Sequence, residues 1–182
     1  GKFAINVEQY CQLFKSAATF ELNEFFVIST CNRTEIYGFA ENAAQLSDLL
    51  CTQTEGTVIQ FNEKAYIKKG QTALEHLFNV AAGLDSQILG DYEIVGQIKQ
   101  SVKFSKANNF IGTYLERIVN AVLQSSKEIK NNTSLSDGTV SVSFAAIQFI
   151  KDKVEDIPNK KILLLGVGKI GANTCKNLID YL

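Results

Sequence analysis

The spacing of apolar residues predicts a helix and then a pair of strands near the start of the chain. Apolar residues recur at helical intervals over 7–18, which predicts a short amphipathic helix. Two runs of aromatic and β-branched residues follow at 25–28 and 36–39, separated by a polar stretch. Such runs are typical of strands, so we expect strand, loop and strand. The leucines within 43–52 share one helical face and predict a second helix.

Two shorter apolar runs, at 58–61 and 65–67, predict further short strands. The expected order is therefore helix, strand, strand, helix, strand. That order belongs to a ferredoxin-like α+β fold, an antiparallel sheet with helices, in which the opening strand is not represented.

The chain beyond these elements is predicted to be helical up to a polar boundary. Residues 71–131 carry apolar stripes at helical spacing, with a break at 108–112 that contains two Asn and a Gly. Residues 131–138 are polar and turn-forming, and we place a domain boundary and a hinge there. The predicted domains are 1–135 and 136–182.

The second domain is expected to begin as the first βα unit of a Rossmann-type fold. A helix is predicted to end before Pro158, and the apolar run 161–165 predicts a buried strand. Gly-Val-Gly-Lys-Ile-Gly follows at 166–171 and opens a predicted helix over 172–182.

In this strand–turn–helix setting the GxGxxG pattern indicates dinucleotide binding. The first glycine permits the tight turn, the second lets a pyrophosphate approach, and the third allows close packing of helix on strand. A glycine-rich turn without a ligand is the alternative. The predicted cofactor-binding residues are Gly166, Gly168 and Gly171. The sequence given ends before the residue that would distinguish NAD from NADP, so we expect an incomplete cofactor site.

Composition is that of an ordinary soluble protein and points to the cytoplasm. Hydrophobic residues make up 46% and charged residues 20%, and no apolar run approaches the roughly 18 residues of a membrane span. The four cysteines, at 11, 31, 51 and 175, lack CxxC spacing, so we expect reduced thiols and no metal site. A net charge of −1 argues against a generally basic nucleic-acid binder. Residues 99–130 carry six basic and two acidic side chains, which fits either solvated helix faces or contact with an RNA backbone.

The polar loop between the two predicted strands carries the candidate nucleophile. Its sequence, with the strand residues on either side, is Ser29-Thr30-Cys31-Asn32-Arg33-Thr34-Glu35. A thiol on a loop held by rigid strands is well placed for function, and a nearby guanidinium favours the nucleophilic thiolate. The alternative is an inert cysteine that serves as a small hydrophobic residue.

Two stretches resemble glutamyl-tRNA reductase. They are STCNRTEIY at 29–37 and GLDSQILGDYEIVGQIK at 83–99, and the similarity runs from about Phe25 to Leu182. The resemblance implies an oxidoreductase that opens tetrapyrrole, porphyrin and heme synthesis. In that family the motif cysteine, here Cys31, attacks the ester of glutamyl-tRNA(Glu), and NADPH reduces the thioester to glutamate-1-semialdehyde.

The resemblance also implies roles for other residues. His76, the only histidine, matches the active-site histidine proposed as general base, although its apolar neighbours would also suit a core histidine. Thr30, Arg33 and Ser86 match positions that hold the glutamate moiety, and a guanidinium suits a carboxylate. Asp91 and Glu93 stand where the family has Gly-Glu-Pro-Gln. Glu93 would there meet the substrate ammonium or turn away, since it would repel a carboxylate.

Three functions are therefore compatible with the sequence. The first is the glutamyl-tRNA reductase reaction, in which the full-length family enzyme is a homodimer that passes its product to glutamate-1-semialdehyde aminomutase. The second is a noncatalytic, dinucleotide-responsive binding module. The third is a cysteine-dependent acyl hydrolase, which would have no use for the glycine loop.

Overall fold

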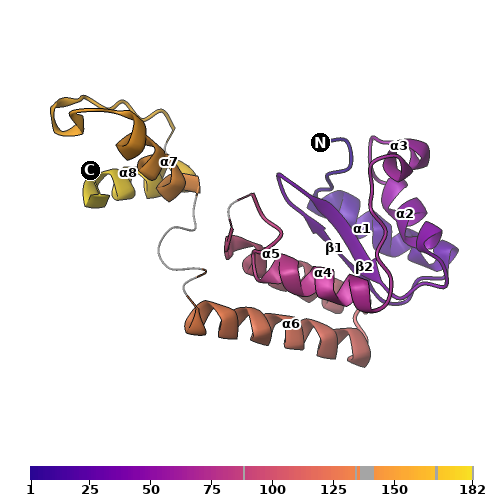
Figure 1. Ribbon diagram of the computed structural model, residues 1–182. Coiled ribbons are helices and arrows are strands. Elements are labelled where there is room, and N and C mark those ends of the chain that lie inside the picture. Colours follow the sequence, from indigo (N-terminus) through magenta and orange to yellow (C-terminus); the bar gives the residue numbers. More distant parts are fainter. Residues whose placement is uncertain (88, 134, 136–141, 167, 182) are drawn as a thin grey trace.

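A computed structural model describes residues 1–87, 89–133, 135, 142–166 and 168–181 (Figure 1). It opens with helix α1 (Val7–Ser16), which confirms the helix expected there, and a 3-10 turn η1 (Ala17–Phe20). Asn6 starts α1 with a capping box, because its side chain accepts from Gln9 N while the Gln9 side chain accepts from Asn6 N, both at 2.9 Å.

The predicted pair of strands forms the sheet of the protein. Strands β1 (Phe25–Ser29) and β2 (Thr34–Gly38) pair in antiparallel register, with Val27 opposite Ile36. Because side chains alternate along a strand, the sheet presents two apolar faces. Phe25 and Val27 pack with α1 and with α2 (Ala43–Cys51), whereas Phe26 and Ile28 pack with the later helices.

The outer edge of β1 is closed by side chains. The Tyr10 hydroxyl accepts from Val27 N at 2.6 Å, and Ser101 Oγ donates to Val27 O at 2.5 Å. Tyr10 also bonds to Ser105 at 2.7 Å, so a hydrogen-bond network takes the place of a neighbouring strand. This satisfies the buried main-chain N–H and C=O of Val27. A cleft runs along the opposite edge of the sheet, beside β2.

The prediction of two additional strands, at 58–61 and 65–67, is wrong. Val58–Asn62 is a short helix, α3, whose N-terminus is capped by the Thr57 hydroxyl accepting from Gln60 N at 3.2 Å. Residues 65–67 are irregular and join no sheet. Short apolar runs do not distinguish a strand from one helical turn. Among the described residues the sheet therefore has two strands, and the α+β expectation holds only in the coarser sense of an α-rich fold with an antiparallel hairpin.

Three helices cover the second face of the hairpin, and they confirm that residues 71–131 are mostly helical. They are α4 (Gln71–Ala81), α5 (Glu93–Ala107) and α6 (Thr113–Asn132). Their apolar faces surround Phe26 and Ile28 and bury Ile98 and Val122 completely. The predicted break between α5 and α6 is present, where Asn109 adopts a φ of 65°. In Figure 1, α4 lies next to β2 and α6 runs beneath α4 and α5.

The last part of the chain contains α7 (Val142–Lys153), the turn Ile157–Asn159 and α8 (Lys169–Tyr181), and α7 packs against α8. The prediction of a buried strand at 161–165 is wrong. The residues Leu163 and Leu165 are 83% and 85% exposed to solvent. A strand needs a partner to satisfy its main-chain groups, and no described segment pairs with this one. Residues 134 and 136–138 of the predicted hinge, 131–138, lie outside the described residues. None of the described helices combines the length and apolarity that a membrane span needs.

Candidate active site

The loop between β1 and β2 is held in a tight turn that leaves its cysteine exposed. Thr30 N donates to Arg33 O at 2.8 Å, and the Thr30 hydroxyl accepts from Asn32 N and Arg33 N, each at 3.1 Å. Thr30 thus closes the turn with its side chain, as Ser and Thr do at such positions. Cys31 is an exposed free thiol at the tip. Cys31 is therefore not buried, and its reactivity stays a prediction.

The Arg33 guanidinium is directed at two carboxylates. Its NH1 group donates to Glu35 Oε1 and to Asp85 Oδ2, each at 3.1 Å, and NH2 donates to the main-chain oxygen of Asp85. Arg33 therefore connects the hairpin to the turn that follows α4. The side chain of Asp85 is 51% exposed, so this carboxylate reaches solvent.

Glu35 is the centre of the hydrogen-bond network. Its side chain is only 9% exposed and accepts from Arg33, from the Tyr37 hydroxyl at 2.5 Å and from the Tyr66 hydroxyl. Burial alone would raise the pKa of Glu35, but the hydrogen bonds from Tyr37, Tyr66 and His76 and the Arg33 charge outweigh it, so the pKa lies below its usual value. The carboxylate is therefore ionised at neutral pH.

His76 lies on α4 with its ring between the two acids. Its Nε2 atom is 3.0 Å from Glu35 Oε1 and 3.1 Å from the Tyr66 hydroxyl, and Nδ1 is 3.8 Å from Asp85 Oδ2. The side chain is 11% exposed. The sole histidine therefore belongs to the polar network of the cleft rather than to the apolar core.

The turn after α4 brings Asp85 into this network but leaves other predicted residues outside it. Gly83 has a φ of 73°, and a Cβ there would come within 2.8 Å of the Asp91 main chain, so the turn requires glycine. Ser86 is half-buried beside Asp85. Asp91 Oδ1 accepts from Glu93 N at 2.9 Å, a local turn contact just before α5.

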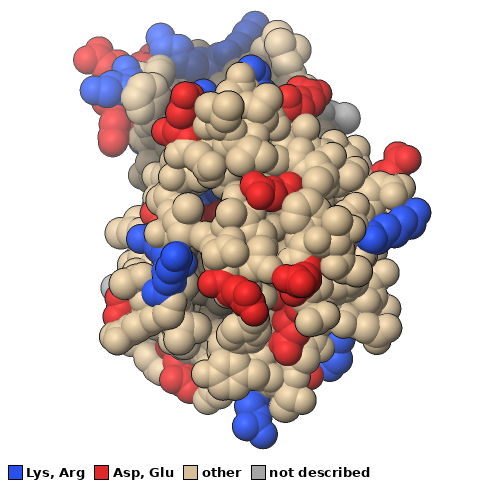
Figure 2. Space-filling view, turned by 90° about the vertical axis from the view of Figure 1, so that its right-hand side faces the viewer, with Lys and Arg blue, Asp and Glu red and all other residues tan. Residues whose placement is uncertain are grey.

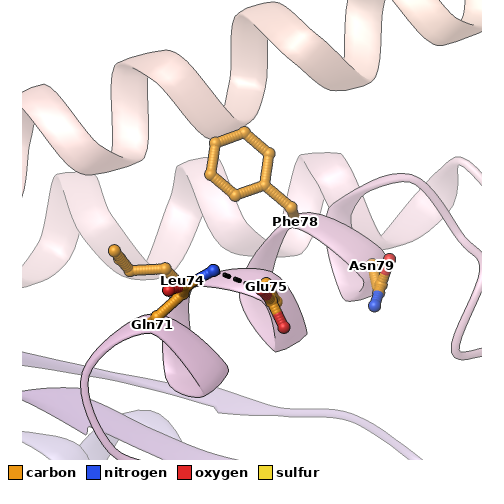
Figure 3. A pocket seen from close by; sticks show the side chains of 5 residues that line it. All are labelled: Gln71, Leu74, Glu75, Phe78 and Asn79. Atoms are coloured by element: carbon orange, nitrogen blue, oxygen red, sulfur yellow. Dashed lines mark hydrogen bonds between the residues drawn. The ribbon is translucent and has the colours of Figure 1, made fainter.

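The cleft along β2 gathers part of the predicted site. It has a volume of about 910 Å³ and is lined by Thr30, Cys31, Arg33 and His76, and also by Glu35. The lining does not include Ser86, Asp91 or Glu93, whose predicted substrate contacts stay predictions. A second, shallow hollow of about 340 Å³ lies on the outer face of α4 between Leu74, Phe78 and a Gln71–Glu75 pair (Figure 3). It contains none of the predicted site residues.

The donor set Glu35, His76 and Asp85 lies close enough to hold a cation, within 4.8 Å of one another. Arg33 already donates to both carboxylates, and its positive charge would oppose a metal ion there. These atoms are therefore better described as an ion-pair network.

Some of the basic side chains within 99–130 are engaged in contacts within the protein. On the face shown in Figure 2, acidic side chains lie near the centre and at the rim, and basic ones lie toward the edge. Within 99–130, Lys106 pairs with Glu116 at 2.5 Å, and Lys130 lies 4.1 Å above the Tyr92 ring. Contact of these helices with tRNA stays a prediction.

Comparison with known proteins decides the family. The model of the family described as "Glutamyl-tRNAGlu reductase, N-terminal domain" matches residues 1–133. The chain belongs to the glutamyl-tRNA reductase family. The glutamyl-tRNA reductase of Flavobacterium psychrophilum is 50% identical over 181 residues, which are 100% of this chain and 44% of that protein. The Aquifex aeolicus enzyme is 35% identical over 152 residues, covering 82% of this chain and 37% of the relative.

The fold agrees with a solved glutamyl-tRNA reductase. The Methanopyrus kandleri structure matches with a TM-score of 0.68 at 24% identity, over 98% of this chain and 42% of that one. At this identity the likeness shows the fold alone. The chain spans less than half the length of these relatives.

Sequence reasoning missed four members of the cleft network. Glu35 and Tyr37 lie on β2, and period-2 alternation places them on one face, a signal that could have identified them. Asp85 lies within the family-like GLDS string. Tyr66 lies in an irregular segment, and no local pattern indicates that its hydroxyl reaches His76.

The three glycines predicted to contact a cofactor differ in their surroundings. Gly166 has a φ of 101°, and a Cβ on Gly171 would lie 2.1 Å from Gly166 O, so both positions require glycine. A Cβ on Gly168 would meet nothing within 4 Å. Binding of a dinucleotide by these glycines stays a prediction.

Proposed function

We propose that this chain carries the acyl-transfer site of a glutamyl-tRNA reductase. The observation that supports it is the exposed thiol of Cys31 in the same cleft as Arg33 and the His76–Glu35 pair. In the proposed reaction the sulfur attacks the ester carbonyl of glutamyl-tRNA(Glu). His76 takes the thiol proton and passes it to the ribose oxygen of tRNA as the carbon–oxygen bond breaks.

Arg33 is the proposed clamp for a substrate carboxylate. A guanidinium binds a carboxylate with two parallel hydrogen bonds, and the exposed Asp85 side chain can yield its place to the substrate. Thr30 has a second role, since its hydroxyl fixes the turn that presents Cys31. Ser86, Asp91 and Glu93 remain proposed substrate contacts on the neighbouring turn.

The proposed outcome is NADPH-dependent formation of glutamate-1-semialdehyde at the start of tetrapyrrole synthesis. NADPH supplies a hydride when bound, and a thioester accepts hydride more readily than an oxygen ester. Gly166, Gly168 and Gly171 are the proposed pyrophosphate contacts. Residues 1–135 would form the catalytic domain and 136–182 the start of the cofactor domain. A cytoplasmic homodimer that transfers its product to the aminomutase completes the proposal.

Mass spectrometry of the acid-quenched protein after mixing with glutamyl-tRNA tests the acyl-transfer step. We expect a glutamyl adduct on Cys31, its loss in Cys31→Ser and its retention in Cys175→Ser. Cys175 is the matched control because its thiol is also exposed. An adduct that survives Cys31→Ser would overturn the assignment.

The same experiment separates the alternative functions. Release of free glutamate without any adduct would favour a hydrolase. No reaction with tRNA, together with binding of a dinucleotide, would favour the binding module.

A further inference from the structure

Tyr66 lies in the irregular segment between α3 and α4 and reaches the centre of the cleft network. Its hydroxyl donates to Glu35 Oε1 and lies 3.1 Å from His76 Nε2. Its ring meets the imidazole edge-on, with centroids 5.1 Å apart and an interplanar angle of 75°. Two independent contacts therefore join this residue to the histidine.

The hydrogen-bond pattern decides which nitrogen of His76 carries the proton. An ionised carboxylate only accepts hydrogen bonds, so Nε2, 3.0 Å from Glu35 Oε1, must be the donor. The single Tyr66 hydroxyl proton is given to Glu35, which leaves a Tyr66 lone pair facing Nε2. Both acceptors thus favour a proton on Nε2, and in the neutral ring the lone pair is on Nδ1.

Tyr66 is suited to this role at all physiological pH values. Burial, followed by the hydrogen bond to Glu35 and its charge, raises the pKa of Tyr66 above its usual value. The hydroxyl therefore stays protonated. The other charged or titratable groups near the imidazole are Glu35 and Asp85, the latter 3.8 Å from Nδ1, together with Arg33 and the Tyr37 ring, whose centroid is 6.5 Å away.

We propose that Tyr66 is a positioning residue that, with Glu35, holds His76 in the Nε2–H tautomer and so reserves Nδ1 for proton transfer. The catalytic meaning of that tautomer rests on the function proposed above, because only then does His76 exchange a proton with the Cys31 thiol. The tautomer itself is a property of the protein without substrate.

Nitrogen NMR of the histidine-labelled 182-residue chain tests the tautomer directly. His76 is the only histidine, so a single imidazole is observed. In the neutral imidazole we expect a protonated Nε2 and a lone-pair Nδ1. In Tyr66→Phe the ratio of Nε2–H to Nδ1–H should fall about two- to twelve-fold, the effect of one lost neutral hydrogen bond. Exchange of the Nε2 proton with water should also become faster.

Tyr114→Phe is the matched control. Tyr114 is an exposed tyrosine that lines the same cleft, and its hydroxyl makes no hydrogen bond within the described part of the chain. Its spectrum should equal that of the wild type. An Nδ1–H tautomer in the wild type, or a Tyr66→Phe spectrum identical to that of the control, would overturn the proposal.

Measuring Cys31 acylation on the same proteins keeps the two proposals apart. A slower adduct formation in Tyr66→Phe, in step with the tautomer shift, supports both. A tautomer shift with unchanged acylation supports the positioning role of Tyr66 and refutes His76 as the proton acceptor.

Discussion

Replacing Glu35 by Gln should destabilise the protein strongly at neutral pH. The carboxylate is 9% exposed and receives hydrogen bonds from Arg33, Tyr37, Tyr66 and His76. A neutral amide keeps one acceptor oxygen and turns a donor group toward these donors. Removing one partner of a buried ion pair typically costs about 3–5 kcal/mol, so we expect a loss of that size. For a chain of this length it corresponds to a fall in Tm of roughly 6–20 °C.

The pH dependence supplies a second, signed test. The pKa of Glu35 is lower in the folded protein than in the unfolded chain, where it is about 4.3. Its contribution is therefore present above pH 4.3 and is lost as the pH falls through the folded value. The free-energy difference between wild type and Glu35→Gln should be largest at pH 7 and should close in acid.

Urea unfolding followed by circular dichroism, repeated from pH 7 to pH 3, measures both quantities. Glu41→Gln is the matched control, since Glu41 is an exposed acid that lines the same cleft. It should change stability by less than about 0.5 kcal/mol. A Glu35→Gln protein within 1 kcal/mol of the wild type at pH 7, or a difference that persists unchanged at pH 3, would refute the reasoning.

Three further substitutions test separate parts of the structure. Arg33→Lys keeps the charge but loses the planar fork of the guanidinium. Binding of glutamyl-tRNA, measured by titration, should therefore weaken about ten-fold or more. An equal loss of stability and binding would make Arg33 a structural residue. Tyr10→Phe leaves the buried Val27 N–H without its acceptor and should cost about 1–3 kcal/mol in urea unfolding, whereas Tyr114→Phe should cost nothing measurable. Gly96→Ala lies inside α5 with open space around its Cβ and should stabilise the protein by about 0.5–1 kcal/mol; a loss of stability would show that the helix is constrained there.

The local pattern of apolar residues was sufficient to predict the elements whose apolar face is long and regular. The first helix and the long helical stretch were predicted correctly because each repeats its helical period over several turns. The strand pair was also predicted correctly, from two apolar runs on either side of a polar loop. The same argument failed at 58–61 and 65–67, where the run is too short for a period to be read. It failed again at 161–165, because a strand depends on a partner elsewhere in the chain.

The candidate site shows the same division. The sequence by itself placed Cys31 and Arg33 on one polar loop between two strands, since such a loop positions both residues locally. The exposure of the Cys31 thiol came from the structure. Only the tertiary structure decided that Arg33 pairs with Asp85, 52 residues away, and that Tyr66 and Glu35 hold His76. A hydrogen bond between distant segments depends on how helix, hairpin and irregular segment pack together. Residue spacing along the chain carries no record of that packing.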